Sequence, residues 1–183
     1  ATSHPAFGQN KRQINEDVRF LLASGNSLRR IARYLGVHRI TVARKLAFLA
    51  RQARESLKLF RASLNNLPGF QFDELETFEH TKYRPLSVLM AVTPDRRKIL
   101  GIEVASMPAT GLLAEKARRK YGRRPDRRGR ALTDLFRLLA PHLTPSPLLR
   151  SDQNPRYPPY VRRFFPGASH VREPGARGCV VGQ

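Results

Sequence analysis

Apolar residues recur at helical spacing in the first third of the chain. Four of them fall at positions i, i+3, i+4 and i+7, namely Leu28, Ile31, Ala32 and Leu35. Ser27 precedes this run as a capping residue, and Gly36 follows it, where a left-handed residue ends many helices. The pattern predicts a helix between Ser27 and Gly36.

Two further helices are predicted, one on each side of this one. The first has Asn15 as its cap and ends at Gly25, and the other begins near Arg39 and meets no proline or glycine before Pro68. A roughly heptad seam runs along the longer helix through Val42, Leu46, Leu49, Ala53, Leu57, Phe60 and Leu64. At 1.5 Å per residue, some 25 residues would reach about 37 Å. We therefore expect its second half to connect to the next domain or to pair with a second subunit as a homodimer.

The pattern changes from helical to alternating after residues 65–69, whose Asn, Pro and Gly are typical of a linker. Three apolar runs follow at 70–78, 87–93 and 98–106, and short turns separate them. This arrangement predicts three adjacent strands in an antiparallel meander.

Helical and strand patterns then alternate. The expected elements are a helix over 111–121, a basic turn over 122–130, a helix around 132–139, a strand over 147–152, a helix starting at 154 and a strand over 168–172. Because a helix separates the strand at 147–152 from the meander, this strand is expected to run parallel to a neighbour. The predicted fold class is α+β or α/β, with a mixed sheet and flanking helices.

The net charge of the chain indicates the class of partner that it binds. Lys and Arg number 34 against 14 Asp and Glu, which gives a net charge of +20. Such a surface neutralises phosphates and releases counterions, so it indicates a nucleic-acid partner. A ribosomal-type RNA binder and a membrane-surface protein are the alternatives. No apolar run approaches the ~18–20 residues of a transmembrane helix, so we expect no membrane partner and a cytoplasmic, nucleoid-associated location.

The three predicted N-terminal helices have the spacing of a helix-turn-helix, the DNA-binding motif in which one helix enters the major groove. Its small core would comprise Ile31, Leu35, Val37, Val42 and Leu46. The side chains that would face the groove or flanking phosphates are His38, Arg39, Thr41, Arg44 and Lys45. The guanidinium of Arg44 is best suited to reading guanine. The preceding helix offers Arg29, Arg30 and Arg33 to phosphates. A solvated basic face on an ordinary three-helix bundle is the alternative.

Acidic residues are scarce, but four of the 14 fall within seven positions: Asp73, Glu74, Glu76 and Glu79. A bound divalent metal would offset their mutual repulsion, although pairing with the many Arg and Lys residues is a common alternative. Strand alternation places Asp73 and Glu74 on opposite faces, so both cannot hold one metal. Asp152 ends the predicted strand at 147–152, and ligand groups gather at such carboxyl ends. A turn or capping role is the alternative for Asp152.

A meander whose first strand carries an acid, a helical crossover and a parallel strand ending in an acid together make the ribonuclease-H-like plan. In that plan the first and fourth strands are neighbours, so Asp73 and Asp152 could share a metal pair. The stretches FDELETFEH (72–80) and SDQNPRYPPYVRRFFPGASH (151–170) resemble insertion-sequence transposases of the DDE class. The order of helix-turn-helix, linker and catalytic domain also matches, and the resemblance covers most of residues 27–173.

The resemblance implies that Asp73 is the first catalytic acid and Asp152 the second. Both would hold Mg²⁺ or Mn²⁺, two ions in the complete enzyme, which cleaves the ends of the element and joins them to target DNA. The arginines at 123–130, with Arg162 and Arg163, would line the path of the strand. The family's third acid has no evident counterpart, because Glu173 precedes Pro174 in a Gly-rich stretch. We therefore expect the chain to stop before that acid.

The resulting domain assignment is 1–12 flexible, 13–64 DNA-binding, 65–69 linker and 70–183 partial catalytic domain. A regulator that occupies the same DNA without cutting it is the alternative to an active transposase. The single cysteine, Cys179, excludes an intramolecular disulfide and a cysteine-based zinc site, and we expect it to be incidental.

Overall fold

The computed structural model describes residues 9–174 and divides the chain into two compact units. The first unit ends at Leu59 and the second begins at Phe60, earlier than the predicted domain boundary at residue 64. The described residues form six α-helices and a five-stranded mixed open sheet, so the predicted combination of helices and a mixed sheet is confirmed. Over the same residues, none of the helices has the length and apolar character needed to cross a membrane.

The first unit is helical throughout. Its elements are η1 (Arg12–Ile14), α1 (Asn15–Ala23), α2 (Leu28–Tyr34) and α3 (Arg39–Ala62), and α3 continues past Leu59 into the second unit. The apolar faces of α1, α2 and α3 meet in a small core of Val18, Ile31, Ala32 and Val42. All three helices were predicted, because a 3.6-residue period of apolar positions is a strong local signal.

One predicted core position is wrong. Leu46 is 41% exposed, whereas Leu49 packs against the core. Val42 and Leu49 lie seven residues apart, two helical turns, and so share a face. Leu46, four residues after Val42, falls on the edge of that face.

Helix caps in this unit differ in part from expectation. The hydroxyl of Ser27 accepts a hydrogen bond from the backbone N–H of Arg30 at 3.3 Å, as predicted. Asn15 does not cap α1: it is the first helical residue, and its buried Oδ1 accepts no hydrogen bond. At the start of α3 the capping role falls to His38, whose Nδ1 accepts from the N–H of Ile40 at 3.2 Å.

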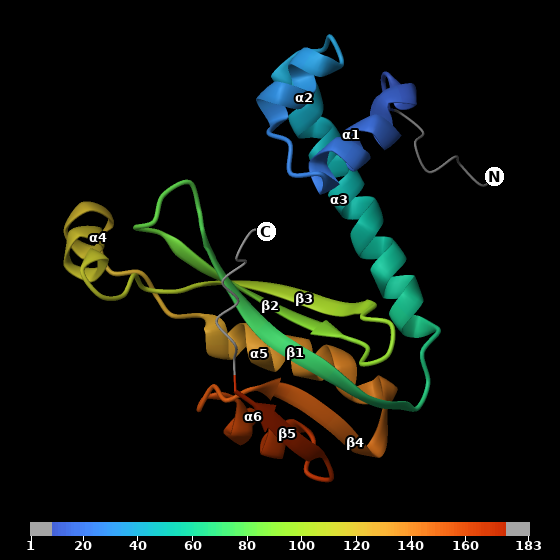
Figure 1. Cartoon of the computed structure of the whole chain (residues 1–183), viewed down its shortest axis with the longest axis vertical. Helices are drawn as coiled ribbons and strands as arrows, with labels where there is room; N and C mark the ends of the chain where they lie inside the picture. The colour runs from blue at the N-terminus through green and yellow to red at the C-terminus, as the bar shows by residue number, and fades with distance from the viewer. Residues whose placement is uncertain (1–8, 175–183) are drawn as a thin grey trace, which may run out of the picture. The chain divides into compact units, whose positions relative to one another are not determined.

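The sheet belongs to the second unit. Its strands are β1 (Leu67–Phe78), β2 (Pro85–Val92), β3 (Ile99–Ser106), β4 (Leu143–Asp152) and β5 (Ser169–Glu173), in the order β3-β2-β1-β4-β5 (Figure 1). The first three strands form an antiparallel meander, and β4 and β5 add to it in parallel on the far side of β1. The predicted meander and parallel fourth strand are therefore confirmed.

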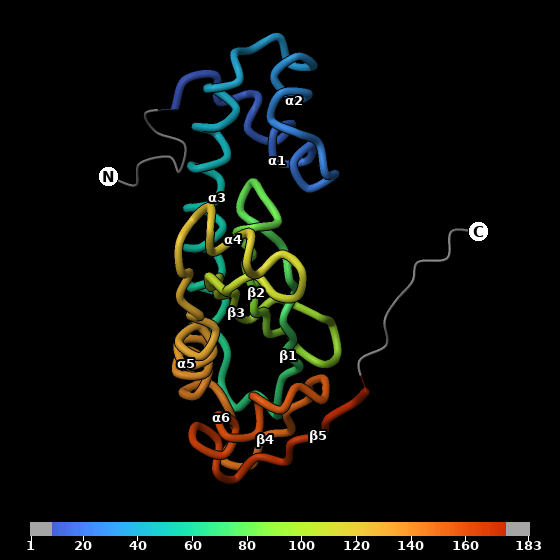
Figure 2. Tube along the Cα trace, turned by 90° about the vertical axis from the view of Figure 1, so that its left-hand side faces the viewer, coloured from blue at the N-terminus to red at the C-terminus, as the bar shows by residue number. Residues whose placement is uncertain are grey.

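Helices of the second unit are α4 (Leu113–Tyr121), α5 (Arg128–Leu139), η2 (Ala140–His142) and α6 (Tyr157–Phe164). The predicted basic turn at 122–130 is too long, because α5 already begins at Arg128. Figures 1 and 2 show α5 and α6 on the same face of the sheet.

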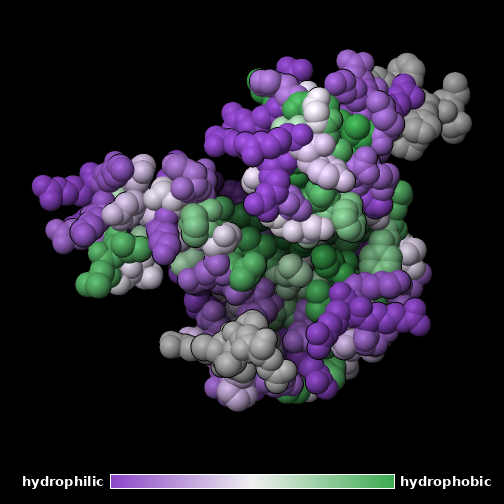
Figure 3. All heavy atoms as spheres, turned by 45° about the horizontal axis from the view of Figure 1, so that its top comes forward, coloured by the Kyte–Doolittle hydropathy of each residue, from purple (hydrophilic) through white to green (hydrophobic). Residues whose placement is uncertain are grey.

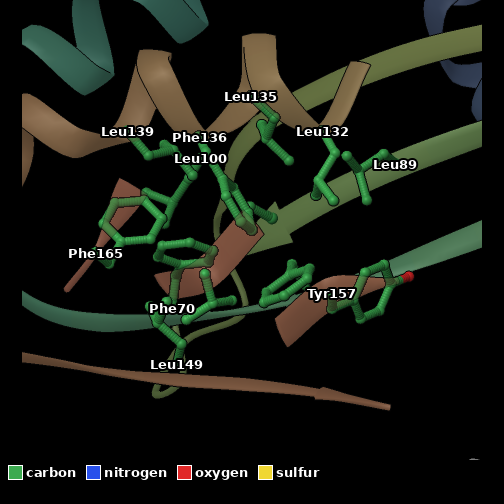
Figure 4. Close-up of a cluster of buried hydrophobic side chains, with 13 residues drawn as sticks. Phe70, Leu89, Leu100, Leu132, Leu135, Phe136, Leu139, Leu149, Tyr157 and Phe165 are labelled. Carbon is green, nitrogen blue, oxygen red and sulfur yellow. The ribbon is translucent and has the colours of Figure 1, made fainter. Parts of the chain in front are cut away.

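The core of the second unit lies between that face and the two helices. Phe70 and Phe72 of β1 meet Phe136 of α5 at ring-centroid distances of 5.9 and 5.1 Å, in edge-to-face contacts. Figure 4 shows the α5 side chains directed at the strands, with Leu149 of β4 on the far side of the cluster. Burying each such aromatic or aliphatic side chain contributes about 1.5–3 kcal/mol, so this core holds β1 and β4 in place.

The start of β1 lies very close to β4. The predicted linker at 65–69 is too long, since β1 begins at Leu67, and the pairing register shifts between Leu67 and Gly69. A Cβ at position 69 would overlap the carbonyl oxygen of Leu148. Only glycine permits this approach, and the bulge sets the register of the rest of the β1–β4 pair.

The predicted flexible segment at 1–12 is described only from Gln9 onward, and residues 1–8 lie outside the described range. Gln9 and Asn10 are in contact with the helical unit, because both accept hydrogen bonds from Lys45. Cys179 also lies outside the described residues.

Candidate active site

Two acids from distant parts of the sequence lie on neighbouring strands. The parallel ladder pairs Phe70 with Leu149 and Gln71 with Arg150. The ladder ends at this last pair, and Asp73 and Asp152 each follow it by two residues, so both lie at the same end of the sheet. Neighbouring strands are about 4.8 Å apart, so the sheet brings the two predicted catalytic acids together.

The carboxylate of Asp73 is held in place by its own backbone. Its Oδ1 accepts a hydrogen bond from the N–H of Glu74 at 2.7 Å. Partial burial raises the pKa of Asp73, the Glu74 hydrogen bond opposes that rise, and the negative charge of Asp152 adds to it. The contribution from Asp152 means that its charge acts on the Asp73 carboxyl group.

Asp152 closes β4 and opens the following turn. Its Oδ1 accepts from the N–H of Asn154 at 3.1 Å, and the Oδ1 of Asn154 accepts from the N–H of Arg156 at 3.1 Å. The turn role considered for Asp152 is therefore correct, and it is compatible with a ligand role. One oxygen fixes the orientation of the carboxylate, and the other remains for a cation.

Glu74 points to the opposite face of β1, as strand alternation predicted. Burial raises the pKa of Glu74, while the positive charges of Arg156 and Arg128 lower it. Ser87, on the neighbouring strand β2, also lowers this pKa. Glu74 lies on the face of the sheet that α5 and α6 cover, so it is not positioned to share a cation with Asp73.

The hydroxyl of Tyr157 is buried nearby and makes no hydrogen bond. Burial raises the pKa of Tyr157, and the charges of Glu74, Asp152 and Asp73 add to the effect. Tyr157 is the first residue of α6 and fully buried. Sequence reasoning did not single it out, because an aromatic residue after Pro155 and Arg156 carries no signal of burial under a carboxylate pair.

Among the four clustered acids at positions 73–79, Glu79 forms ion pairs. It pairs with Arg84 and Arg124 at 3.1 Å each, so the ion-pair alternative is correct for this residue.

Glu173 lies on β5, level with Asp152, and its carboxylate is 3.6 Å from Arg150. Within residues 9–174, no three His, Cys, Asp or Glu side chains come close enough together to hold a metal ion.

The basic stretch at 123–130 is partly neutralised by ion pairs. Arg128 binds Asp126 at 2.6 Å, and Arg130 lies 3.7 Å from Asp134. Hydrogen bonding from Arg128 lowers the pKa of Asp126 to about 2, against the effect of burial. Some of the arginines predicted to line a DNA strand thus have a structural role as well.

The predicted DNA-reading residues of the first unit are mostly exposed. The exposed ones are Arg29, Arg30, Arg33, His38, Arg39 and Arg44, and Thr41 is half-buried. Their exposure is compatible with DNA binding and does not test it.

Lys45 is the exception, and the prediction that it faces outward is wrong. It is 3% exposed, and its Nζ donates to the carbonyl oxygen of Asn10 at 2.6 Å and to Oε1 of Gln9 at 3.3 Å. Burial lowers the pKa of Lys45, and the charge of Arg12 lowers it further. The missed signal was its spacing, three residues after Val42 and four before Leu49, on the core face of α3.

Comparison with known proteins assigns no relative: no protein-family model matches the chain, and no curated protein matches it significantly.

Proposed function

We propose that this chain is a DNA-binding protein of the DDE transposase type. It would combine a helix-turn-helix unit with a ribonuclease-H-like unit that carries out metal-dependent cleavage and transfer of DNA strands. The observation that carries the proposal is the alignment of Asp73 and Asp152 on β1 and β4, in a chain with a net charge of +20.

The sheet topology supports the ribonuclease-H-like part of the proposal. An antiparallel meander followed by a helical crossover to β4, which lies parallel beside β1, is the arrangement expected from that plan. In this arrangement the first strand carries one acid and the fourth strand ends in the other. Fold alone does not determine activity, so the proposal depends on the acids rather than on the sheet.

Asp73 and Asp152 fit a divalent cation. Mg²⁺ is commonly bound through one or two carboxylates together with substrate phosphates and water, and each of these carboxylates has one oxygen engaged by a backbone N–H and one left over. Burial raises the pKa of Asp73, and the negative charge of Asp152 adds to the rise; a cation would relieve this repulsion. When bound, the metal would activate the attacking oxygen and stabilise the leaving oxygen of a phosphoryl transfer.

The protein's own residues would orient the reaction. The N–H groups of Glu74 and Asn154 hold the two carboxylates at fixed angles. Arg123 and Arg162, both exposed, would attract the phosphates of the strand. Positioning of this kind is a large part of catalysis in phosphoryl transfer.

The helical unit would supply binding to duplex DNA. The side-chain cap from His38 fixes the first turn of α3, and Arg39 and Arg44 project from that helix into solvent. Arg44 would read a base edge, and the arginines of α2 would contact phosphates without specifying sequence.

The test begins with selection of preferred duplexes from a randomised pool, followed by a nicking assay on the selected DNA with Mg²⁺ or Mn²⁺. We expect metal-dependent nicks from the natural chain and none from Asp73→Asn or Asp152→Asn. Asp134→Asn is the matched control, because this acid pairs with Arg130 on α5, and it should leave nicking unchanged.

Three other outcomes would contradict the proposal in different ways. Selective binding without any nicking would indicate a regulator that occupies DNA without cutting it. Nicking that survives both substitutions would assign the activity to other residues. Affinity for RNA equal to or above that for duplex DNA, unchanged by Arg44→Ala, would indicate a structural RNA binder.

A further inference from the structure

A pocket of about 840 Å³ lies beside α4, away from the predicted catalytic acids. This open pocket is lined by Tyr83 and Arg84 of the β1–β2 turn, by α4, and by the segment from Gly122 to Asp126. Binding sites for small ligands commonly have volumes of about 300–1,000 Å³. The pocket is therefore large enough for one nucleotide and too small for a DNA duplex.

The lining of this pocket is predominantly cationic. Four arginines line it, Arg84, Arg118, Arg123 and Arg124, against the two acids Glu115 and Asp126. Asp126 is already bound by Arg128, outside the lining. Among the ion pairs formed within residues 9–174, none includes Arg118 or Arg123. The pocket thus has cations in excess, which suits an anionic ligand.

Arg124 adds an unsatisfied donor. Its side chain is 17% exposed, and one of its terminal nitrogens pairs with Glu79 at 3.1 Å. Its Nε is buried and has no hydrogen-bond acceptor. A buried donor without an acceptor costs about 1–3 kcal/mol, and a phosphate oxygen would supply the acceptor.

Two aromatic rings line the same pocket. The rings of Tyr83 and Tyr121 have centroids 6.2 Å apart at an angle of 40°. Tyr121 ends α4 and is 42% exposed, and the ammonium of Lys120 lies 5.4 Å from its ring centroid. Exposed aromatic faces between cations are the usual means of holding unpaired bases, which stack on the ring while arginine or lysine binds the backbone.

We infer that this pocket binds one unpaired nucleotide of a DNA strand, with the base against Tyr121 and the phosphate at Arg118 and Arg124. The inference rests on the proposed function, since it names the strand segment that the protein would hold beside the cleavage site. Glu79, which pairs with the lining residue Arg124, follows the end of β1 and is six positions after Asp73, a distance of about 20 Å at 3.3 Å per residue. A strand passing the acids can therefore reach the pocket.

An acidic peptide is the main competing ligand, because it too would bind arginines. The two tyrosines favour a nucleotide, since a carboxylate side chain has no aromatic ring to stack on them. Figure 3 shows that the part of the molecule at the left of the view, which carries α4, has mostly hydrophilic side chains together with a hydrophobic group at its lower edge.

The experiment measures the affinity of the full chain for three forms of one selected duplex. One form is blunt, one carries a short single-stranded overhang, and one carries an overhang of the same length without bases. The natural chain should bind the base-containing overhang more tightly than the abasic one by about 5- to 150-fold, the range of one stacked base. A 2-aminopurine in the overhang should lose fluorescence on binding, because stacking quenches it.

Matched variants separate stacking from charge. Tyr121→Ala should abolish the difference between the two overhangs, whereas Tyr121→Phe should keep it and blunt-duplex binding should stay unchanged in both. Arg118→Ala should weaken both overhangs equally, and Arg119→Ala, the neighbouring exposed arginine outside the pocket lining, should weaken neither.

Equal affinity for the two overhangs, with blunt-duplex binding and nicking intact, would overturn this inference and leave the proposed function standing. Displacement of the overhang by an acidic peptide at lower concentration than by a single-stranded oligonucleotide would also overturn it. Failure to bind any DNA would overturn both.

Discussion

The closeness of Asp73 and Asp152 has a cost in stability that a single substitution should reveal. Neighbouring strands lie about 5 Å apart, and we take this spacing as the separation of the two carboxylates. Two full charges at that distance repel by about 3 kcal/mol at an effective dielectric of ~20 and by about 0.8 kcal/mol in water. Both groups are partly solvent-exposed, so the screened value near 1 kcal/mol is the appropriate expectation.

Asp152→Asn removes this repulsion and keeps the turn, because an amide oxygen can still accept from the N–H of Asn154. We expect the variant to unfold at a higher urea concentration than the natural chain at pH 7 with EDTA present, by roughly 0.5 M. Tyrosine fluorescence can follow the second unit, since four of the five tyrosines lie after Leu59. Mg²⁺ should stabilise the natural chain and have little effect on the variant.

The pH dependence supplies a check on the cause. The pKa of Asp73 is raised, so the folded state binds this proton more tightly than the unfolded state. The penalty therefore grows as pH rises through the window between the ordinary value of 3.8 and the raised one, and it is absent below that window. The advantage of Asp152→Asn should vanish at low pH.

Asp134→Asn is the control for replacing an acid in this unit. It removes an attraction to Arg130 at 3.7 Å, so it should leave stability unchanged or lower it by a few tenths of a kcal/mol. The reasoning is refuted if Asp152→Asn also lowers the urea midpoint. It is refuted as well if Mg²⁺ stabilises the natural chain and Asp152→Asn equally.

Three further predictions follow from the packing. Gly69→Ala should destabilise the second unit by about 2 kcal/mol or more, because its Cβ would overlap the Leu148 carbonyl. Gly111→Ala, at a positive φ in open space, should cost only about 1 kcal/mol. Equal urea midpoints for the two variants would contradict this prediction. His38→Ala should lower the thermal stability of the helical unit by about 1 kcal/mol through loss of the α3 cap, measured by circular dichroism, whereas His38→Asn should retain most of it. Asp126 has a pKa lowered to about 2 by Arg128, so its contribution is complete above about pH 4 and is lost as pH falls toward 2; parallel pH–stability profiles for the natural chain and Asp126→Asn would rule that out.

Periodicity predicted most of the elements because burial imposes a repeat on helices and strands. It also placed Asp73 and Glu74 on opposite faces of β1, since successive strand residues alternate. The parallel pairing of β4 with β1 followed from the intervening helix, which a parallel connection requires. These are local rules, and each needs only neighbouring residues.

Contacts between residues that are distant in the sequence could not be predicted from it. Lys45 is buried because Gln9 and Asn10, 36 and 35 positions earlier, supply acceptors for its ammonium. The bulge at Gly69 that sets the β1–β4 register depends on the carbonyl of Leu148. No pattern along the chain indicates that such groups will meet.

The same limit applies to the pocket beside α4. Tyr83 and Tyr121 are far apart in the sequence, and each alone reads as an ordinary surface tyrosine. Their meeting depends on how α4 packs against the β1–β2 turn, which helical periodicity does not determine. The candidate acids were easier to find, because negative residues are rare in a chain this basic.

The most direct test of the central claim is a crosslink between positions 73 and 152. Asp73→Cys and Asp152→Cys are combined with Cys179→Ser, so that the chain has only two thiols, and treated with dibromobimane, which fluoresces strongly only when it bridges neighbouring thiols. The side-by-side carboxylates predict rapid fluorescence from the monomeric chain, and little from a chain with Glu74→Cys in place of Asp73→Cys, whose thiol lies on the other face of β1. Equal fluorescence from the two pairs, or none from the 73–152 pair, would contradict the account.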